Sequence, residues 1–99
     1  MKVKVATTAQ IPDDHGLRVV AGDREIALFR VDGRIYAISN VCRHLGGPLA
    51  DGWLEGRKVA CPWHNWTYDV TTGACTLAPN ASLTTFPVTV DGDDVFVEV

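Results

Sequence analysis

The sequence predicts an all-β domain, an antiparallel β sandwich or barrel. Short runs of alternating or β-branched apolar residues recur along the chain, and Gly and Asp residues separate them at short intervals. No stretch of ten residues has the apolar period of a helix. A chain of 99 residues is enough for one domain, so we expect residues 1–99 to form a single fold with one small core.

The N-terminal half is expected to form four strands. Residues 2–7 alternate apolar and polar side chains, and residues 18–20 and 25–31 are rich in apolar and β-branched side chains. The pair Asp32 and Gly33 then separates residues 25–31 from residues 34–39, where alternation resumes. Asp-Gly is a preferred pair for a two-residue hairpin turn, so these two strands should pair directly.

The C-terminal half repeats the pattern with shorter strands. The expected strands are residues 59–60, 67–70, 74–77, 85–90 and 95–99. A turn at 71–73 should join 67–70 to 74–77, and a turn at 91–94 should join 85–90 to 95–99. Residues 48–51 are expected to form at most one helical turn.

Two short motifs supply four potential metal ligands. Cys42 and His44 form C-x-H, and after sixteen residues Cys61 and His64 form C-x-x-H. Two Cys and two His are the ligands of a [2Fe–2S] centre in which His replaces Cys on one iron. We therefore expect both Cys on one iron and both His on the other. Such a centre holds and passes one electron, and neutral imidazole makes it easier to reduce than an all-thiolate cluster.

Two other interpretations of these residues are open. Cys2His2 is also a tetrahedral zinc set, which would make the chain a zinc-stabilised binding module. Common zinc motifs pair like with like, whereas each loop here offers one Cys and one His, and this order favours the cluster. The four residues could also be core cysteines and surface histidines, but four ligands rarely fall into two short loops by chance.

Composition narrows the partners and the compartment. The net charge is −3 and no basic run is present, which argues against nucleic acid. With Cys42 and Cys61 as ligands only Cys75 remains, so no intramolecular disulfide is expected, as suits the cytoplasm. We interpret Cys75 as a small core residue and His15 as a solvated loop residue. The first residues resemble neither an export signal nor a membrane span.

The motifs and their flanks resemble the Rieske-type ferredoxin family. The matching segments are residues 42–49, 61–66, 68–69, 72–73, 79 and 86–88. The nearest resemblance is to ferredoxin components of bacterial aromatic-ring-hydroxylating dioxygenase systems, and the small subunit of assimilatory NAD(P)H nitrite reductase is similar too. The resemblance implies a three-sheet β fold with one Rieske-type [2Fe–2S] cluster. Two cluster-binding loops, about 41–48 and 61–67, would form a small subdomain.

Further residues are expected around the cluster. They are Leu45, Gly46, Gly47, Trp63, Asn65, Trp66, Tyr68 and Pro79. The two glycines would let the backbone approach the sulfides, and the two tryptophans would exclude water. The resemblance places Pro79 in a loop over the cluster. Members of this family usually have Gly at the position of Asn65, and Asn tolerates the same left-handed backbone.

The resemblance also separates this chain from the Rieske proteins of respiratory complexes. Their two additional bridging cysteines are replaced here by Gly47 and Trp63, and their serine by Trp66. Tyr68 matches their tyrosine, whose hydroxyl raises the reduction potential, although a core aromatic is an equal interpretation. A potential near the low end of the Rieske range is therefore expected.

The chain is expected to be an electron carrier and not an enzyme. A mononuclear iron oxygenase site needs two His and a carboxylate, and only His15 remains after the cluster. No G-x-G-x-x-G motif for a nicotinamide or flavin is present. The expected partners are a flavoprotein reductase and a terminal oxygenase, or alternatively a nitrite reductase large subunit. We expect a cytoplasmic protein, monomeric when free, that binds neither nucleic acid nor membrane.

Overall fold

The computed structural model describes residues 1–41, 48–62, 66–76 and 81–99. The expected all-β class is confirmed, with three antiparallel sheets. The strands are β1 (Lys2–Thr7), β2 (Leu17–Ala21), β3 (Arg24–Val31), β4 (Arg34–Ser39), β5 (Trp53–Glu55), β6 (Lys58–Ala60), β7 (Thr67–Asp69), β8 (Thr85–Phe86), β9 (Val88–Asp91) and β10 (Asp94–Glu98). Two single 3-10 turns, η1 (Thr8–Gln10) and η2 (Leu49–Asp51), complete the assigned elements, and η2 confirms the turn expected at 48–51.

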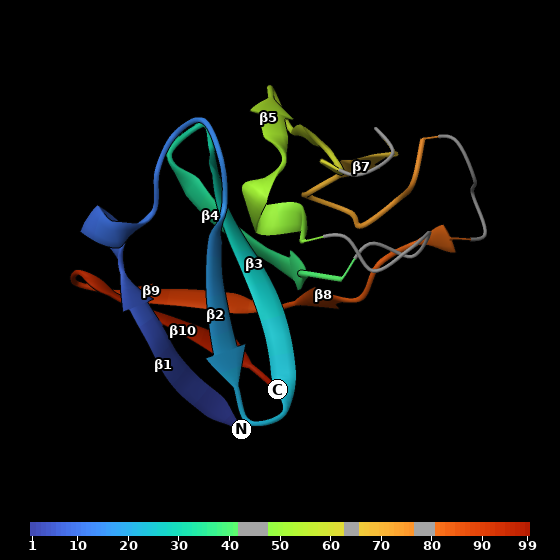
Figure 1. The fold of residues 1–99 in the computed structure, drawn as a ribbon. Helices are drawn as coiled ribbons and strands as arrows, with labels where there is room; N and C mark the ends of the chain where they lie inside the picture. The colour runs from blue at the N-terminus through green and yellow to red at the C-terminus, as the bar shows by residue number, and fades with distance from the viewer. Residues whose placement is uncertain (42–47, 63–65, 77–80) are drawn as a thin grey trace.

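The three sheets divide the chain into a base and a subdomain (Figure 1). In the base, one sheet has the order β1-β10-β9 and the other the order β2-β3-β4-β8. The subdomain is the sheet β5-β6-β7, which lies above one end of the base. The chain ends meet at the far end of the base, where the Val99 amide donates to the Met1 carbonyl at 3.0 Å. The subdomain, which contains the second motif, therefore lies far from both termini (Figure 1).

The hairpin between β3 and β4 has the expected two-residue turn. Val31 pairs with Arg34, and the turn residues Asp32 and Gly33 have φ values of 52° and 78°. Positive φ at both central positions defines the type I′ turn, whose twist matches that of the flanking strands. Asp and Gly tolerate this backbone, which is why the local sequence signal identified the hairpin correctly.

Strand β3 is buried on both faces because it lies between two cores. Ile26 and Leu28 face the core shared by the two sheets of the base, where they pack with Val95 and Val97 of β10. Phe29 faces the opposite way, into the core beneath the subdomain. This alternation follows the two-residue period of a strand, so β3 contributes side chains to both cores.

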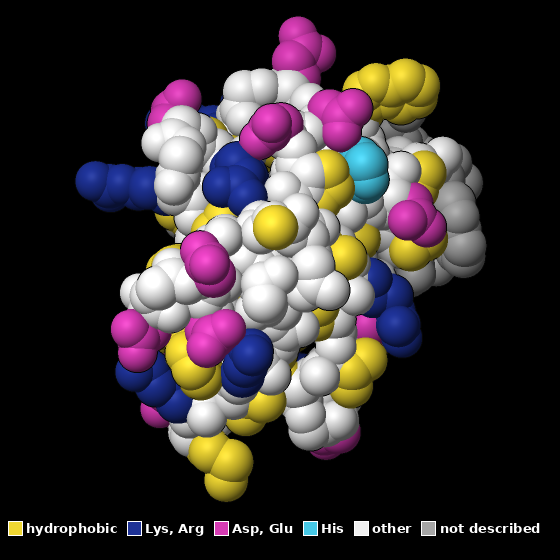
Figure 2. All heavy atoms as spheres, turned by 90° about the vertical axis from the view of Figure 1, so that its left-hand side faces the viewer, with side chains coloured by type: hydrophobic (Ala, Val, Ile, Leu, Met, Phe, Trp, Pro, Cys, Tyr) yellow, Lys and Arg dark blue, Asp and Glu magenta, His cyan; other side chains and the backbone are white. Residues whose placement is uncertain are grey.

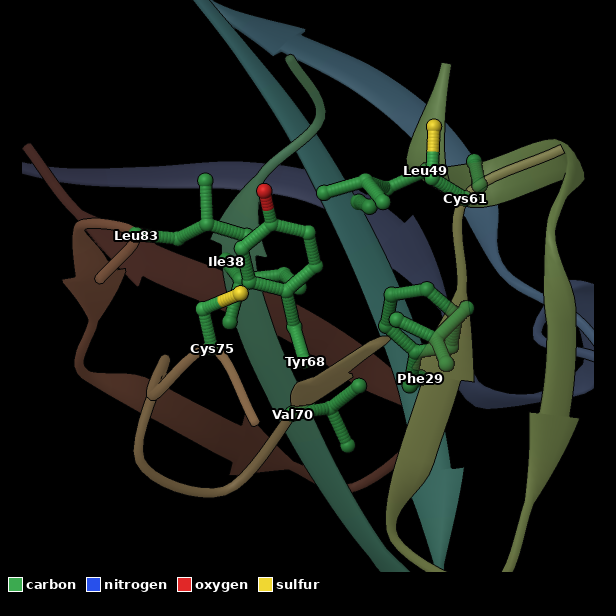
Figure 3. Packing of buried hydrophobic residues seen from close by; sticks show 11 residues of the cluster. Phe29, Ile38, Leu49, Cys61, Tyr68, Val70, Cys75 and Leu83 are labelled. Atoms are coloured by element: carbon green, nitrogen blue, oxygen red, sulfur yellow. The ribbon is translucent and has the colours of Figure 1, made fainter. Parts of the chain in front are cut away.

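The second core fixes the subdomain on the base (Figure 3). Phe29 and Ile38 come from β3 and β4, Leu49 from η2, and Tyr68 and Val70 from the subdomain side. All five side chains are almost fully buried. Burying such side chains stabilises a fold by about 1.5–3 kcal/mol each, so the subdomain is held by packing as well as by its connections.

One strand expected from the sequence is divided in two. Residues 85–90 form β8, which pairs with β4, and β9, which pairs with β10 in the other sheet. Pro87 stands between them and has no N–H to donate to a ladder. The chain changes sheets at this residue, and the Pro87 carbonyl still accepts from the Glu98 amide at 3.0 Å.

The expected strand at 74–77 was also wrong in extent. Tyr68 and Cys75 form an isolated bridge, and Leu77 lies outside the described residues. Gly73 has a φ of 81° and its amide donates to the Asp69 carbonyl, so the chain turns tightly before Cys75. Conversely, the strand β5 was not expected from the sequence.

Charged side chains of both signs are interspersed over the face drawn in Figure 2. Some form pairs, such as Lys4 with Asp94 at 3.1 Å and Arg30 with Asp13 at 3.3 Å. Exposed pairs of this kind contribute at most about 1 kcal/mol each, so the cores dominate the stability. Among the described residues, no helix is long and apolar enough to span a membrane.

Candidate metal centre

The described residues include only part of the candidate centre. Cys61 is the one predicted ligand among them, while Cys42, His44 and His64 lie outside the described residues. Of the predicted neighbours, Trp66 and Tyr68 are described. The others, which lie outside, are Leu45, Gly46, Gly47, Trp63, Asn65 and Pro79.

The base of the first loop is closed by backbone pairing. Val41 and Pro48 form an antiparallel bridge on either side of residues 42–47. One step further out, the Leu49 amide donates to the Asn40 carbonyl at 2.9 Å. The two chain ends that enter and leave the first motif are therefore held side by side.

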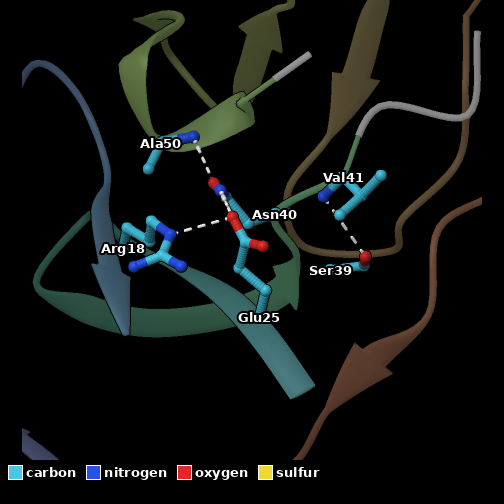
Figure 4. Close-up of polar contacts among 6 residues, drawn as sticks. All are labelled: Arg18, Glu25, Ser39, Asn40, Val41 and Ala50. Atoms are coloured by element: carbon cyan, nitrogen blue, oxygen red, sulfur yellow. Dashed lines mark hydrogen bonds and ion pairs between the residues drawn. The ribbon is translucent and has the colours of Figure 1, made fainter. Parts of the chain in front are cut away.

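The side chain of Asn40 strengthens this closure (Figure 4). Asn40 is fully buried, and its Oδ1 accepts from the Ala50 amide at 2.7 Å. Its Nδ2 donates to Glu25 Oε1 at 2.8 Å, and the same carboxylate oxygen accepts from Arg18 Nε at 2.8 Å. The bonds from Arg18 and from Asn40 lower the pKa of Glu25. The chain of contacts thus runs from the exposed surface to the entry of the first loop.

A short backbone bond closes the base of the second loop. The Cys61 amide donates to the Trp66 carbonyl at 2.7 Å, directly beyond the paired ends of β6 and β7. Cys61 is buried, and Trp66 is partly buried against the same core. The prediction that Trp66 packs beside the site is consistent with this position.

The side chains of Tyr68 and Cys61 lie in the same core (Figure 3). In that view the Tyr68 hydroxyl and the Cys61 sulfur both project toward the same end of the core. Tyr68 is fully buried, as its interpretation as a core aromatic requires. Cys75 is also buried and packs in this cluster, which confirms its prediction as a core residue. His15 is exposed, as expected of a loop residue.

The strand before Cys61 passes very close to Gly52. A Cβ placed on Gly52 would lie 2.1 Å from the carbonyl oxygen of Ala60. Trp53, the next residue, pairs with Ala60 in the ladder, and its side chain is 82% exposed. The second loop is therefore positioned by a glycine contact on one side, and an exposed aromatic lies beside it.

Asp69 stabilises the turn that follows β7. Its Oδ1 accepts from the Thr71 amide at 2.9 Å and from the Thr71 hydroxyl, and Oδ2 pairs with Arg57 Nε at 3.1 Å. Burial by itself raises the pKa of Asp69, but the two Thr71 bonds and Arg57 outweigh it and hold the pKa below its ordinary value. Asp69 is therefore a stable anion that fixes the exit of β7.

The described residues fit a centre that takes ligands from two loops. No group of three or more metal-binding side chains occurs among them, so a complete site would also need the predicted ligands outside the described residues. A buried thiolate needs a compensating positive charge, and ferric iron supplies it. Both closed loop bases lie at the rim of the core that contains Cys61. The arrangement is that of a small β domain with a buried cysteine beside two closed loop bases.

Comparison with known proteins agrees with this class. Residues 1–87 match the Rieske [2Fe-2S] domain model. The chain is 38% identical over 91 residues to the ferredoxin component of the naphthalene 1,2-dioxygenase system of Pseudomonas aeruginosa, covering 91% of this chain and 88% of the relative. The Sphingomonas yanoikuyae B1 ferredoxin has a TM-score of 0.91 at 28% identity and covers 100% of this chain and 99% of its own.

Two further structures bear on partners. The first is the ferredoxin-sized match in the complex of reduced oxygenase and oxidized ferredoxin in carbazole 1,9a-dioxygenase, with a TM-score of 0.87, 30% identity, and coverage of 97% and 91%. The second is the putative NADH-dependent nitrite reductase small subunit from Mycobacterium tuberculosis, with a TM-score of 0.89, 23% identity, and coverage of 98% and 93%. At that identity the second likeness shows the fold alone.

The chain belongs to the Rieske [2Fe-2S] domain family. It is a ferredoxin-type electron carrier and not a catalytic subunit, and its cofactor is a Rieske-type [2Fe–2S] cluster, as the sequence predicted. The zinc-module alternative was wrong, because the family is defined by the iron–sulfur cluster.

Several residues around the site were missed from the sequence. Asn40 and Gly52 hold the two loop bases, and Trp53 is exposed beside the second loop. The one available signal was the position of Asn40 two residues before Cys42, at the end of a predicted strand. Its partners Glu25 and Ala50 are 15 and 10 residues away in sequence, so no local pattern joins them.

Proposed function

We propose that the chain carries single electrons from a flavoprotein reductase to the terminal oxygenase of an aromatic-ring-hydroxylating dioxygenase system. The observation that carries this proposal is the 38% identity, across 91% of the chain, to the ferredoxin component of such a system. The likeness to a ferredoxin in complex with its oxygenase supports the same direction of transfer.

The proposed ligands are Cys42 and Cys61 on one iron and His44 and His64 on the other. The interleaved order of the two motifs supports this assignment. Cys61 is supported further, since it is buried at the closed base of its loop, next to the core. When bound, the cluster accepts and releases one electron without a change of ligands.

The residues beneath the site would keep it dry and rigid. Leu49, Cys61 and Tyr68 are buried together, and Trp66 covers part of this core. A rigid, water-poor surrounding reduces the rearrangement that accompanies a change of charge. The protein's contribution to electron transfer would therefore be to hold the ligands still while the charge of the centre changes.

The partners and the compartment follow from this role. The reductase and the oxygenase would be separate chains that this carrier contacts in turn, so we propose a monomer when free. Weak, small interfaces suit electron carriers, which must dissociate between transfers. We propose that it is cytoplasmic, since with Cys42 and Cys61 as ligands Cys75 is the one remaining cysteine and cannot form a disulfide within the chain. The nitrite reductase alternative is not carried forward, since its structural likeness shows the fold alone.

Cluster content and transfer can be tested on one preparation. The purified chain should contain iron and acid-labile sulfide near two each, as the cluster formula requires. It should then restore NADH-dependent naphthalene oxidation when it replaces the ferredoxin component beside the naphthalene dioxygenase reductase and oxygenase. The Cys61→Ser variant, without a complete cluster, is the control and should restore none.

Transfer to a nitrite reductase is the competing outcome. The same preparation is mixed with an assimilatory nitrite reductase large subunit and NADH, and nitrite consumption is measured. Stimulated nitrite consumption without any naphthalene oxidation would overturn the proposed role. A colourless protein that contains one zinc would overturn the ligand proposal.

A further inference from the structure

We infer that Asn40 is a positioning residue for the first cluster loop, acting together with Glu25. The inference rests on the proposed ligands Cys42 and His44 and concerns how their loop is held. Asn40 is not adjacent in sequence to a proposed ligand, since Val41 lies between it and Cys42. Its role would be exerted through the closure of the loop base.

The contacts of Asn40, which follows β4, reach two other elements, η2 and β3. Its side chain reaches Ala50 of η2 through Oδ1 at 2.7 Å and Glu25 of β3 through Nδ2 at 2.8 Å. Its backbone amide donates to the Glu25 carbonyl at 3.0 Å, and its carbonyl accepts from the Leu49 amide at 2.9 Å. Four hydrogen bonds therefore fix one residue, which stands directly after β4.

These bonds control both ends of residues 42–47. The entry of the loop begins at Val41, and the exit runs through Pro48 into Leu49 and Ala50, which are bonded to Asn40. Since the entry and the exit are attached to one buried side chain, a shift of that side chain would move both. Cys42 and His44 would then change position relative to Cys61 on the other loop.

The Glu25 end of the network is charged and anchored. Arg18 Nε donates to Glu25 Oε1, the oxygen that also accepts from Asn40 (Figure 4). A carboxylate that accepts two donors at 2.8 Å holds them more firmly than a neutral oxygen would. Since Asn40 is fully buried, its Nδ2 depends on Glu25 for this hydrogen bond.

The test exchanges the donor and the acceptor of this pair. Asn40→Asp keeps the size of the side chain and the Ala50 bond, but it places a carboxylate 2.8 Å from the Glu25 carboxylate. Glu25→Gln keeps the acceptor oxygen for both Asn40 and Arg18. In the double variant, the new amide at position 25 can donate to the new carboxylate at position 40, which restores this hydrogen bond with reversed direction, while the exposed Arg18 side chain can turn to the amide oxygen.

The readout is the rate of cluster loss, followed by visible absorbance after addition of an iron chelator. Mutation of the outer-shell partners of metal ligands typically lowers metal affinity by about 10–100-fold. We expect a change of similar size in the rate of cluster loss here. Asn40→Asp should lose the cluster at least about 10-fold faster, Glu25→Gln should lose it only slightly faster than wild type because it keeps a weaker acceptor, and the double variant should recover most of the difference. The EPR spectrum of the reduced Asn40→Asp protein should shift, because the ligands move.

A matched control separates positioning from general stability. Arg30, near the other end of β3 from Glu25, is also partly buried and bonded to backbone carbonyls, those of Thr8 and Ile11. Arg30→Met should lower the melting temperature without changing the rate of cluster loss at 25 °C or the EPR spectrum. Equal acceleration in Arg30→Met and Asn40→Asp, or no rescue in the double variant, would overturn the inference.

A milder variant covers the case in which Asn40→Asp does not fold. Glu25 is partly exposed, so Glu25→Ala should fold, and it should lose the cluster faster than Glu25→Gln. Equal rates in these two variants would overturn the role of the Asn40–Glu25 pair. Wild-type iron and sulfide are counted first, so that a failure of the proposed ligands is distinguished from a failure of this inference.

Discussion

The amide of Cys61 donates to the carbonyl of Trp66 at 2.7 Å, and this bond closes the second loop at its base. It places Cys61, the one described residue among the proposed ligands, at the end of a hairpin formed by β6 and β7. The first loop is closed in a similar way by the Val41–Pro48 bridge. A Rieske cluster would thus be held by two loops whose bases are closed by backbone contacts.

Replacement of Tyr68 by Phe should lower the reduction potential. Tyr68 is fully buried, and its hydroxyl projects toward the same end of the core as the Cys61 sulfur (Figure 3). We expect this hydroxyl to donate to a cluster or ligand sulfur, which stabilises the more negative, reduced form. The expected decrease is tens of millivolts, since about 59 mV corresponds to a tenfold change for one electron. Redox titration measures it, and an unchanged potential would assign Tyr68 to packing.

Replacement of Gly52 by Ala should destabilise the domain and the second loop. The added Cβ would lie 2.1 Å from the Ala60 carbonyl oxygen, so β6 must shift next to Cys61. Overpacking of this kind costs about 1–3 kcal/mol, and denaturant unfolding should show a loss in that range. Gly22→Ala is the control, because no atom lies within 4 Å of its new Cβ and only the positive φ of 65° is strained.

Gly22→Ala should therefore cost free energy of unfolding without affecting the cluster. Gly52→Ala should in addition lower the iron content of the purified protein, because Ala60 precedes Cys61 directly. If both variants retain the wild-type iron content, the contact between Gly52 and Ala60 does not position the loop.

Asp69 should make stability depend on pH in the acid range. Its pKa is lowered in the folded protein from an ordinary value of 3.8. A lowered pKa stabilises the fold above the unfolded value, and this contribution is lost as pH falls through the folded value. Asp69→Asn should be less stable than wild type at pH 7 by about 1 kcal/mol, since it loses charge-assisted bonds to Thr71 and Arg57.

The difference in free energy of unfolding between the two proteins should shrink from about pH 5 to pH 3. Acid loss of the cluster affects both proteins, so it largely cancels in that difference. A constant difference across this range would show that Asp69 acts through its shape and not through its charge.

The parts of the fold that were predicted correctly are those with local signals. The β3–β4 hairpin follows from Asp32 and Gly33, whose preferred backbone is the turn itself. Pro87 shows the limit of such signals, since residues 85–90 have the pattern of one strand but belong to two sheets. The missing N–H of Pro87 was visible in the sequence, but the strands that pair on its two sides come from distant parts of the chain.

The candidate site shows the same limit. The spacing of Cys42, His44, Cys61 and His64 identified the cofactor, because metal ligands must be particular residue types at short spacings. Asn40 could not be identified in this way. A single Asn at the end of a strand is common, and only the fold brings Glu25 and Ala50 to its side chain.

Pulsed EPR of the reduced protein tests the central claim, a [2Fe–2S] cluster ligated by two thiolates and two imidazoles. Nitrogen bound directly to iron couples its nuclear spin to the unpaired electron, so ¹⁵N-histidine labelling reports the ligands themselves. The account predicts strong coupling to two histidine nitrogens, one each from His44 and His64, in wild type, with His15→Gln unchanged as control. A reduced cluster without strongly coupled histidine nitrogen would contradict it.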